Sequence, residues 1–120
     1  MKYLFLDTSV LLHYQSFEDV PWKRLLGVSD AITIVICETV IAEIDKHKDG
    51  QRSKLRDRAK RISRQLSSIF LEGKSSQIPV VFVPYTSPTE QEAIRYDVSI
   101  NDNRILLSAL HCQYPSTDIV

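Results

Sequence analysis

The sequence has little glycine and cysteine, no long apolar run and no net charge. Its three glycines are too few for a glycine-rich phosphate loop, and it contains no G-x-G-x-x-G or Walker motif. Cys37 and Cys112 lack the C-x-x-C or Cys/His spacing of a metal site, and two cysteines do not make a disulfide framework. We predict that both are buried, reduced thiols.

No segment is suited to a membrane or to secretion. The longest uncharged apolar stretch, residues 31–37, is far shorter than the roughly 20 residues that cross a bilayer. The apolar run at residues 3–6 ends at Asp7, too early for a signal peptide. We therefore expect a soluble, cytoplasmic protein without membrane contact. A length of 120 residues, with 43 % hydrophobic and 25 % charged residues, is ordinary for one globular domain.

Charge is distributed unevenly along the chain. From Lys46 to Arg64 there are nine basic and two acidic residues, so this segment carries +7. The remaining six basic and 13 acidic residues carry −7. The zero total therefore hides one basic block in an acidic remainder.

The apolar pattern predicts strands that alternate with helices. We expect strands at residues 3–6, 31–36 and 80–83, and a strand that begins at 118–120. Helices are expected directly after Asp7, at about 18–26 with Gly27 as the stop, and at 38–48. A long helix is expected from the basic block to near Gly73. A further helix is expected to start at a Ser87 cap, with Pro88 in the first helical position, and to run to about 96, and a last helix follows a Ser99 or Asn101 cap. This order predicts an α/β fold with a mostly parallel sheet, whose carboxyl edge gathers functional groups.

Three acidic residues stand near the expected carboxyl edge. Each has an ordinary alternative role: Asp7 as a helix cap, Glu43 as a surface residue and Asp102 as a partner of a helix dipole. If the three converge, their carboxylates repel and need a compensating charge. Hard oxygen ligands select Mg²⁺ or Mn²⁺, which can activate water for phosphodiester cleavage.

The segments around these acids resemble the PIN domain family. Tyr3-Leu-Phe-Leu-Asp7-Thr-Ser, Ile36-Cys-Glu-Thr-Val-Ile-Ala-Glu43 and Asn101-Asp102-Asn-Arg-Ile-Leu are similar to its three motifs in order. The resemblance implies a Rossmann-like three-layer fold and a metal-dependent ribonuclease that cleaves single-stranded RNA. It implies that Asp7, Glu43 and Asp102 are the catalytic metal ligands, with the hydroxyl of Thr8 or Ser9 holding metal or water. It also implies a homodimer, an inhibitory protein partner or an additional domain as partners.

One departure from the family affects the expected activity. The family usually carries a further acid after the next strand, and Asp118 precedes that strand and does not match. We therefore expect one domain, residues 1–120, that lacks its C-terminal strand and helix and has weak or absent activity. The alternative is a non-catalytic scaffold that binds RNA or a protein. A phosphoryl-transfer or receiver-like domain would need a lysine near the acids on a later strand, and none is visible.

The basic block predicts a surface that follows RNA phosphates. The alternative is a solvated helix face. Because no aromatic residue interleaves with the block, binding should be sequence-poor and sensitive to salt. His13, His47 and His111 lack metal-like spacing and are expected to be structural or exposed. The predicted nucleic-acid-binding residues are Lys46, Lys48, Arg52, Lys54, Arg56, Arg58, Lys60 and Arg61.

Overall fold

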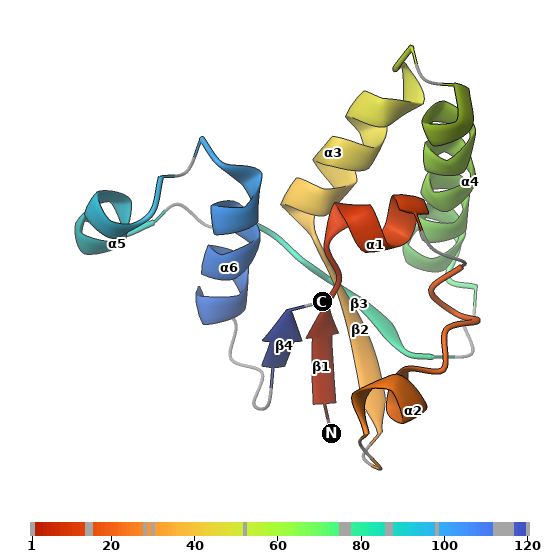
Figure 1. Cartoon of the computed structure of the whole chain (residues 1–120), viewed down its shortest axis with the longest axis horizontal. Coiled ribbons are helices and arrows are strands. Elements are labelled where there is room, and N and C mark those ends of the chain that lie inside the picture. The colour runs from red at the N-terminus through yellow and green to blue at the C-terminus, as the bar shows by residue number, and fades with distance from the viewer. Residues whose placement is uncertain are drawn as a thin grey trace.

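The computed structural model has the predicted α/β architecture (Figure 1). It describes residues 2–13, 16–27, 29, 31–51, 53–74, 78–85, 88–97, 99–111 and 117–119, and among these not the side chains of 101, 102 and 117–119. Cys37 is buried as predicted, and Cys112 lies outside the described residues. Within the described part of the chain, no helix has the length and apolar character needed to cross a membrane.

Among the residues that the structure describes, four parallel strands form the sheet in the order β3-β2-β1-β4. They are β1 (Lys2–Phe5), β2 (Ile32–Cys37), β3 (Val80–Val83) and β4 (Thr117–Ile119). All six residues of β2 are buried, because this uncharged and largely β-branched strand lies inside the sheet. The strand predicted at 80–83 is confirmed, and those predicted at 3–6 and 31–36 are present but begin one residue away from their predicted starts. The expectation that Asp118 precedes the last strand is wrong, because Asp118 lies within β4 and pairs with Leu4 of β1.

The strand order places a switch point at the carboxyl end of β1. The chain steps from β1 to β2 and then to β3 on one side, and it returns to β4 on the other side of β1. In parallel α/β sheets the edge at such a switch point is where ligands commonly bind. Phe5 pairs with both Val35 and Ile119, which places the residues that follow β1 at this switch point.

Within the described ranges, six helices connect the strands, and α3 with α4 forms the largest helical contact. Figure 1 shows this pair rising beyond the carboxyl edge, with α1 across it. The apolar stripe of α4 supplies Ala59, Ile62 and Leu66 to the core, as predicted. The helices are α1 (Thr8–His13), α2 (Trp22–Leu26), α3 (Glu38–Lys48), α4 (Ser53–Phe70), α5 (Glu90–Arg95) and α6 (Asn101–His111).

The helix expected at 18–26 is shorter than predicted. Only α2 is helical, because Pro21 precedes it and the residues before Pro21 form a turn. Trp22 is buried and its Nε1 donates a 2.8 Å hydrogen bond to the carbonyl of Phe17, which ties this turn to the helix. The predicted stop at Gly27 is confirmed by its left-handed φ of 64°.

Two other helix ends differ from the prediction. The cap of α5 is Thr89, which with Glu92 forms a reciprocal capping box, so the assignment of Pro88 to the first helical position is wrong. Ser87 lies outside the described residues. Helix α4 ends at Phe70, three residues before the predicted stop near Gly73, and Gly73 has a left-handed φ of 69°.

Candidate active site

Asp7 lies directly beyond β1 at the switch point. Its carbonyl accepts hydrogen bonds from the N–H groups of Val10 and Leu11, which starts α1. Among the described residues, its carboxylate Oδ1 accepts a local hydrogen bond, 2.7 Å from the N–H of Thr8. A capping side chain normally bonds one or two residues further into the helix. Asp7 therefore begins α1 mainly through its backbone, and its half-buried carboxylate lies at the carboxyl edge of the sheet.

The structure distinguishes between the two hydroxyls that follow Asp7. Thr8 is 4 % exposed, and its Oγ1 is buried without a hydrogen-bond partner among the described residues. Ser9 is exposed. A buried hydroxyl without a partner costs about 1–3 kcal/mol. The supporting role that the sequence left open between the two residues therefore fits Thr8 better.

Glu43 occupies the second turn of α3. Its side chain is half-buried, and Oε1 is fully buried without a hydrogen-bond partner in the described part of the chain. The interpretation of Glu43 as an ordinary surface residue is therefore wrong. Because α3 follows β2, the direct neighbour of β1, Glu43 rises from the same edge that carries Asp7.

Asp102 is the second residue of α6, in the first turn as predicted. The expected cap at Ser99 or Asn101 is wrong, because Asn101 is already helical and the carbonyl of Ile100 accepts the first hydrogen bonds of the helix. Helix α3 contacts both α1 and α6, so the backbone brings the three acid-bearing elements together. The side chain of Asp102 lies outside the described residues, and the convergence of all three carboxylates stays a prediction. The described side chains alone contain no group of three or more His, Cys, Asp or Glu that could share a metal ion.

The oxygen atoms at this edge fit a hard divalent cation. Mg²⁺ and Mn²⁺ prefer carboxylate and neutral oxygen ligands. Among the described residues, the two buried side-chain oxygens without partners are Thr8 Oγ1 and Glu43 Oε1, and each belongs to one of the acidic motifs. Native proteins rarely leave such atoms unpaired. A cation beside them would give both the partner that the described residues do not supply.

The predicted basic residues divide between two sides of α4. Arg58 donates to the carbonyl of Leu12, and Gln65 donates to Ser16, so one side of α4 faces α1. Lys48 of α3 donates to Ser63 on the other side of α4 and pairs with Asp45. Thus Lys48 and Arg58 have structural contacts. Lys46, Lys54, Lys60 and Arg61 are exposed, Arg56 is half-buried, and Arg52 lies outside the described residues.

An ion pair that the sequence pattern does not predict joins α5 to α6. His111 Nε2 lies 2.8 Å from Glu92 Oε1. The N–H of Thr89 also donates to this carboxylate, and together with His111 it lowers the pKa of Glu92 below its ordinary value. The Thr-x-x-Glu spacing of residues 89–92 is the sequence signal for the capping part of this arrangement. Nothing in the spacing pointed to His111, because 19 residues separate it from Glu92.

Comparison with protein-family models shows which family the chain belongs to. The model of the PIN domain matches residues 4–118, almost the whole chain, and the protein belongs to the PIN domain family. PIN domains are a family of nucleases and typically use divalent metals. The comparisons with curated proteins and with solved structures gave no match.

Proposed function

We propose that the chain is a metal-dependent endoribonuclease that cuts single-stranded RNA at Asp7, Glu43 and Asp102. The observation that carries the proposal is the pair of buried oxygens, Thr8 Oγ1 and Glu43 Oε1, that lack partners among the described residues. They belong to two motifs of a nuclease family, on two elements that contact each other. Leaving them unpaired costs free energy, and a cation site offsets that cost.

In this proposal each element holds one ligand. Asp7 follows β1, Glu43 rides on α3, and Asp102 begins α6, so the rigid sheet edge fixes their separation. These three carboxylates would hold Mg²⁺ or Mn²⁺, which would offset their charge and supply an activated water and charge stabilisation at the phosphate. Thr8 orients the donor set through its hydroxyl. The water oxygen bonds to phosphorus and the P–O3′ bond breaks, which leaves a 5′-phosphate and a 3′-hydroxyl that takes up a proton.

The RNA backbone is proposed to follow the α1 side of α4. Helical residues advance about 100° each, so Lys54 and Arg61 lie on the same side of α4 as Arg58. Arg58 contacts the last turn of α1. The six residues of α1 make a helix about 9 Å long, and its other end lies at the acid site. Phosphates held by Lys54 and Arg61 would lead the strand along α1 toward Asp7.

A cleavage assay tests the catalytic part of the proposal. End-labelled single-stranded RNA is incubated with Mn²⁺ and with wild type, Asp7→Asn or Glu43→Gln. We expect slow cleavage by wild type and loss of cleavage in both variants. Glu72→Gln, at an exposed position beyond α4, is the matched control and keeps the wild-type rate. Cleavage that survives in Asp7→Asn removes this residue from the site, and RNA binding by a wild type that never cleaves supports the scaffold alternative.

A further inference from the structure

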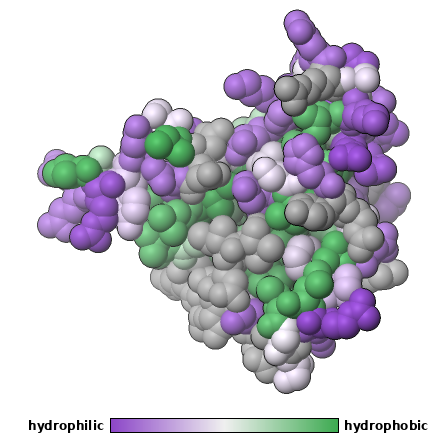
Figure 2. Space-filling model, viewed as in Figure 1, coloured by the Kyte–Doolittle hydropathy of each residue, from purple (hydrophilic) through white to green (hydrophobic). Residues whose placement is uncertain are grey.

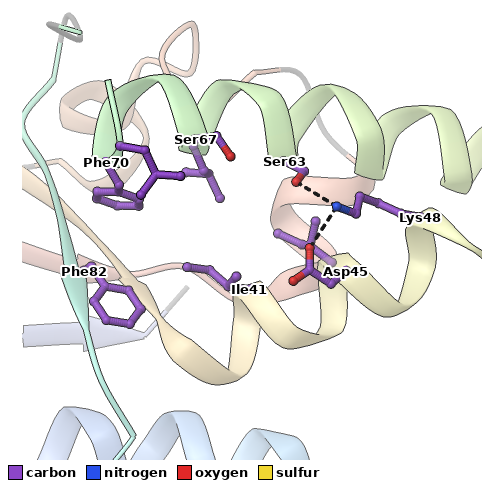
Figure 3. A pocket seen from close by; sticks show the side chains of 10 residues that line it. Ile41, Asp45, Lys48, Ser63, Ser67, Phe70 and Phe82 are labelled. Atoms are coloured by element: carbon purple, nitrogen blue, oxygen red, sulfur yellow. Dashed lines mark hydrogen bonds and ion pairs between the residues drawn. The ribbon is translucent and has the colours of Figure 1, made fainter. Parts of the chain in front are cut away.

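An apolar groove lies between α3, α4 and the edge strand β3 (Figure 3). It has a volume of about 560 Å³. The α3 residues that line it recur at steps of three and four, whereas Glu43 lies two residues beyond Ile41, about 200° around the helix. The groove therefore opens on the side of α3 away from the acid site. Its apolar lining consists of Ile41, Ile44, Leu66, Phe70, Leu71 and Phe82.

The groove continues into a basic depression. This second hollow, of about 280 Å³, is lined by Lys48, Lys60, Arg64, Ser63 and Asp49, and it shares Lys48 and Ser63 with the groove. Figure 3 shows Lys48 between Ser63 and Asp45, which fixes the junction of the apolar and basic parts. An occupant that fits both parts needs an apolar side chain next to a carboxylate.

The same chain presents such a pair of side chains on α5. Glu92 faces α6 through His111, and Glu90 and Ile94 lie two residues to either side of Glu92, on the opposite face of α5. Ile94 is 88 % exposed. Figure 1 shows α5 projecting from the body, and Figure 2 shows an apolar patch among hydrophilic residues on this projection.

We propose that α5 of one copy docks into the groove of a second copy. Ile94 enters between Phe70, Leu71 and Phe82, and Glu90 points toward Lys60 and Arg64. Residues four apart on a helix have Cβ atoms about 5–6 Å apart, which suits adjoining apolar and basic hollows. Docking covers three exposed large apolar side chains: Ile94, Leu71 at 84 % and Phe82 at 43 %. An RNA strand bound in the groove would not bury its aliphatic side chains against apolar groups, so a second copy of the protein is the better occupant.

This contact joins two different surfaces of the protein and leaves the acid site open. A six-residue helix buries less surface than a stable dimer needs, so the association is weak and in fast exchange. Because Glu90 meets basic side chains, salt weakens it further. It does not depend on the proposed nuclease activity, and Asp7→Asn leaves it unchanged.

Sedimentation equilibrium of the wild type and two variants tests the contact. We expect the average mass of wild type to rise with concentration, and Ile94→Glu and Leu71→Asp each to stay monomeric. Both positions are highly exposed, so the variants fold, which circular dichroism checks. Their equimolar mixture associates again, because one variant keeps the groove and the other keeps α5. Leu25→Glu, at a 66 % exposed position of α2, is the matched control and associates like wild type.

A charge exchange tests the basic end of the groove. Glu90→Lys alone and the Lys60→Glu/Arg64→Glu double variant alone are expected to weaken association, and their mixture is expected to restore it. A wild type that stays monomeric at every concentration overturns the proposal. Loss of association in Leu25→Glu overturns it as well, and so do mixtures of variants that do not associate again, because nonspecific association would then explain the rise in average mass. Lower RNA affinity in Leu71→Asp without any self-association assigns the groove to RNA instead.

Discussion

Arg58 on α4 donates a 3.0 Å hydrogen bond from Nη1 to the backbone carbonyl of Leu12 in α1. The last carbonyls of a helix have no donor within the helix, and a cation there also complements the helix dipole. Because α1 starts at Asp7 and has only six residues, this bond fixes the helix that positions Asp7 and Thr8. Arg58, a member of the basic block, therefore supports the candidate active site by holding α1 in place.

Replacing Arg58 with alanine should destabilise the fold. A hydrogen bond to a charged group contributes about 1.5–3 kcal/mol, and partial exposure reduces this, so we expect a loss of about 1–2 kcal/mol in the free energy of unfolding. Urea denaturation measures it. Arg64→Ala, at an exposed position of the same helix, should change stability by less than about 0.5 kcal/mol. Equal effects of the two substitutions would contradict the capping role.

Removing Lys54 and Arg61 together should weaken RNA binding and reduce its salt dependence. Each phosphate contact to a single strand contributes about 0.7 to the slope of log affinity against log salt, so the double alanine variant should lose about 1.4. Fluorescence anisotropy of a labelled single-stranded RNA at several salt concentrations measures the slope. Wild type must first show a salt-dependent affinity.

The matched control for this experiment removes the same two residue types elsewhere. Lys23 and Arg24 are exposed on α2, next to the amino end of β2 and therefore at the edge opposite the acid site. Their double alanine variant should keep the wild-type slope. A loss as large as that of the Lys54/Arg61 variant would show that RNA responds to overall charge and follows no particular side of α4.

The core elements were predictable because their sequence signals are local. The buried strand predicted at 31–36 follows from an uncharged, β-branched run, and the helix at 38–48 follows from its apolar spacing. The stop at Gly27 follows from the residue type, because glycine tolerates the left-handed conformation found there. The helix expected at 18–26 failed because its apolar residues instead pack a turn held by Trp22, a contact that periodicity does not encode. The cap of α5 was misplaced because Ser87 and Thr89 both precede a helical segment, and the reciprocal bonds with Glu92 favour Thr89.

The candidate site was predictable as positions in the chain, but not as contacts. The motifs gave Asp7 and Glu43, whereas burial of Thr8 Oγ1 and Glu43 Oε1 depends on how α1 and α3 pack. The composition of the basic block suggested one RNA surface. Packing ties Arg58 to α1 and Lys48 to Ser63, and it assigns Lys60 to the far side of α4. Phe70 and Phe82 are far apart in the sequence, and the fold brings their ring centroids to 6.2 Å.

Acid should weaken the contribution of Glu92 to stability. Its pKa is lowered in the folded protein, first by the N–H of Thr89 and then by His111, from an ordinary value of 4.5. A lowered pKa stabilises the fold above the unfolded value, and this contribution is lost as the pH falls through the folded value. The stability difference between wild type and Glu92→Gln should therefore be full at pH 7 and shrink below about pH 4.5.

Urea denaturation from pH 7 to about pH 3 measures this difference. Glu90→Gln is the control, because Glu90 lies on the opposite face of α5 from the His111 contact. The difference in the free energy of unfolding between Glu90→Gln and wild type should vary less with pH. A difference for Glu92→Gln that grows on acidification would contradict the account.

Glu43→Met should stabilise the protein in metal-free buffer. Methionine has a similar length and removes the buried Oε1 that lacks a partner among the described residues, so we expect a gain of about 1 kcal/mol. Thermal and urea denaturation in the presence of a chelator measure it. Asp45→Asn on the other side of α3 breaks an exposed ion pair and should change stability by less than about 0.5 kcal/mol. Destabilisation by Glu43→Met would mean that the carboxylate has a stabilising partner.

The response of the melting temperature to Mn²⁺ tests the shared cation site most directly. A ligand at about 100 times its Kd adds about 2.7 kcal/mol of stability, and each kcal/mol raises the Tm of a domain this size by about 3–5 °C. Wild type should melt several degrees higher at saturating Mn²⁺, while Asp7→Asn and Glu43→Gln should show little rise and Glu72→Gln the full rise. A wild type whose Tm ignores Mn²⁺, or an Asp7→Asn variant that responds as strongly as wild type, would contradict the site.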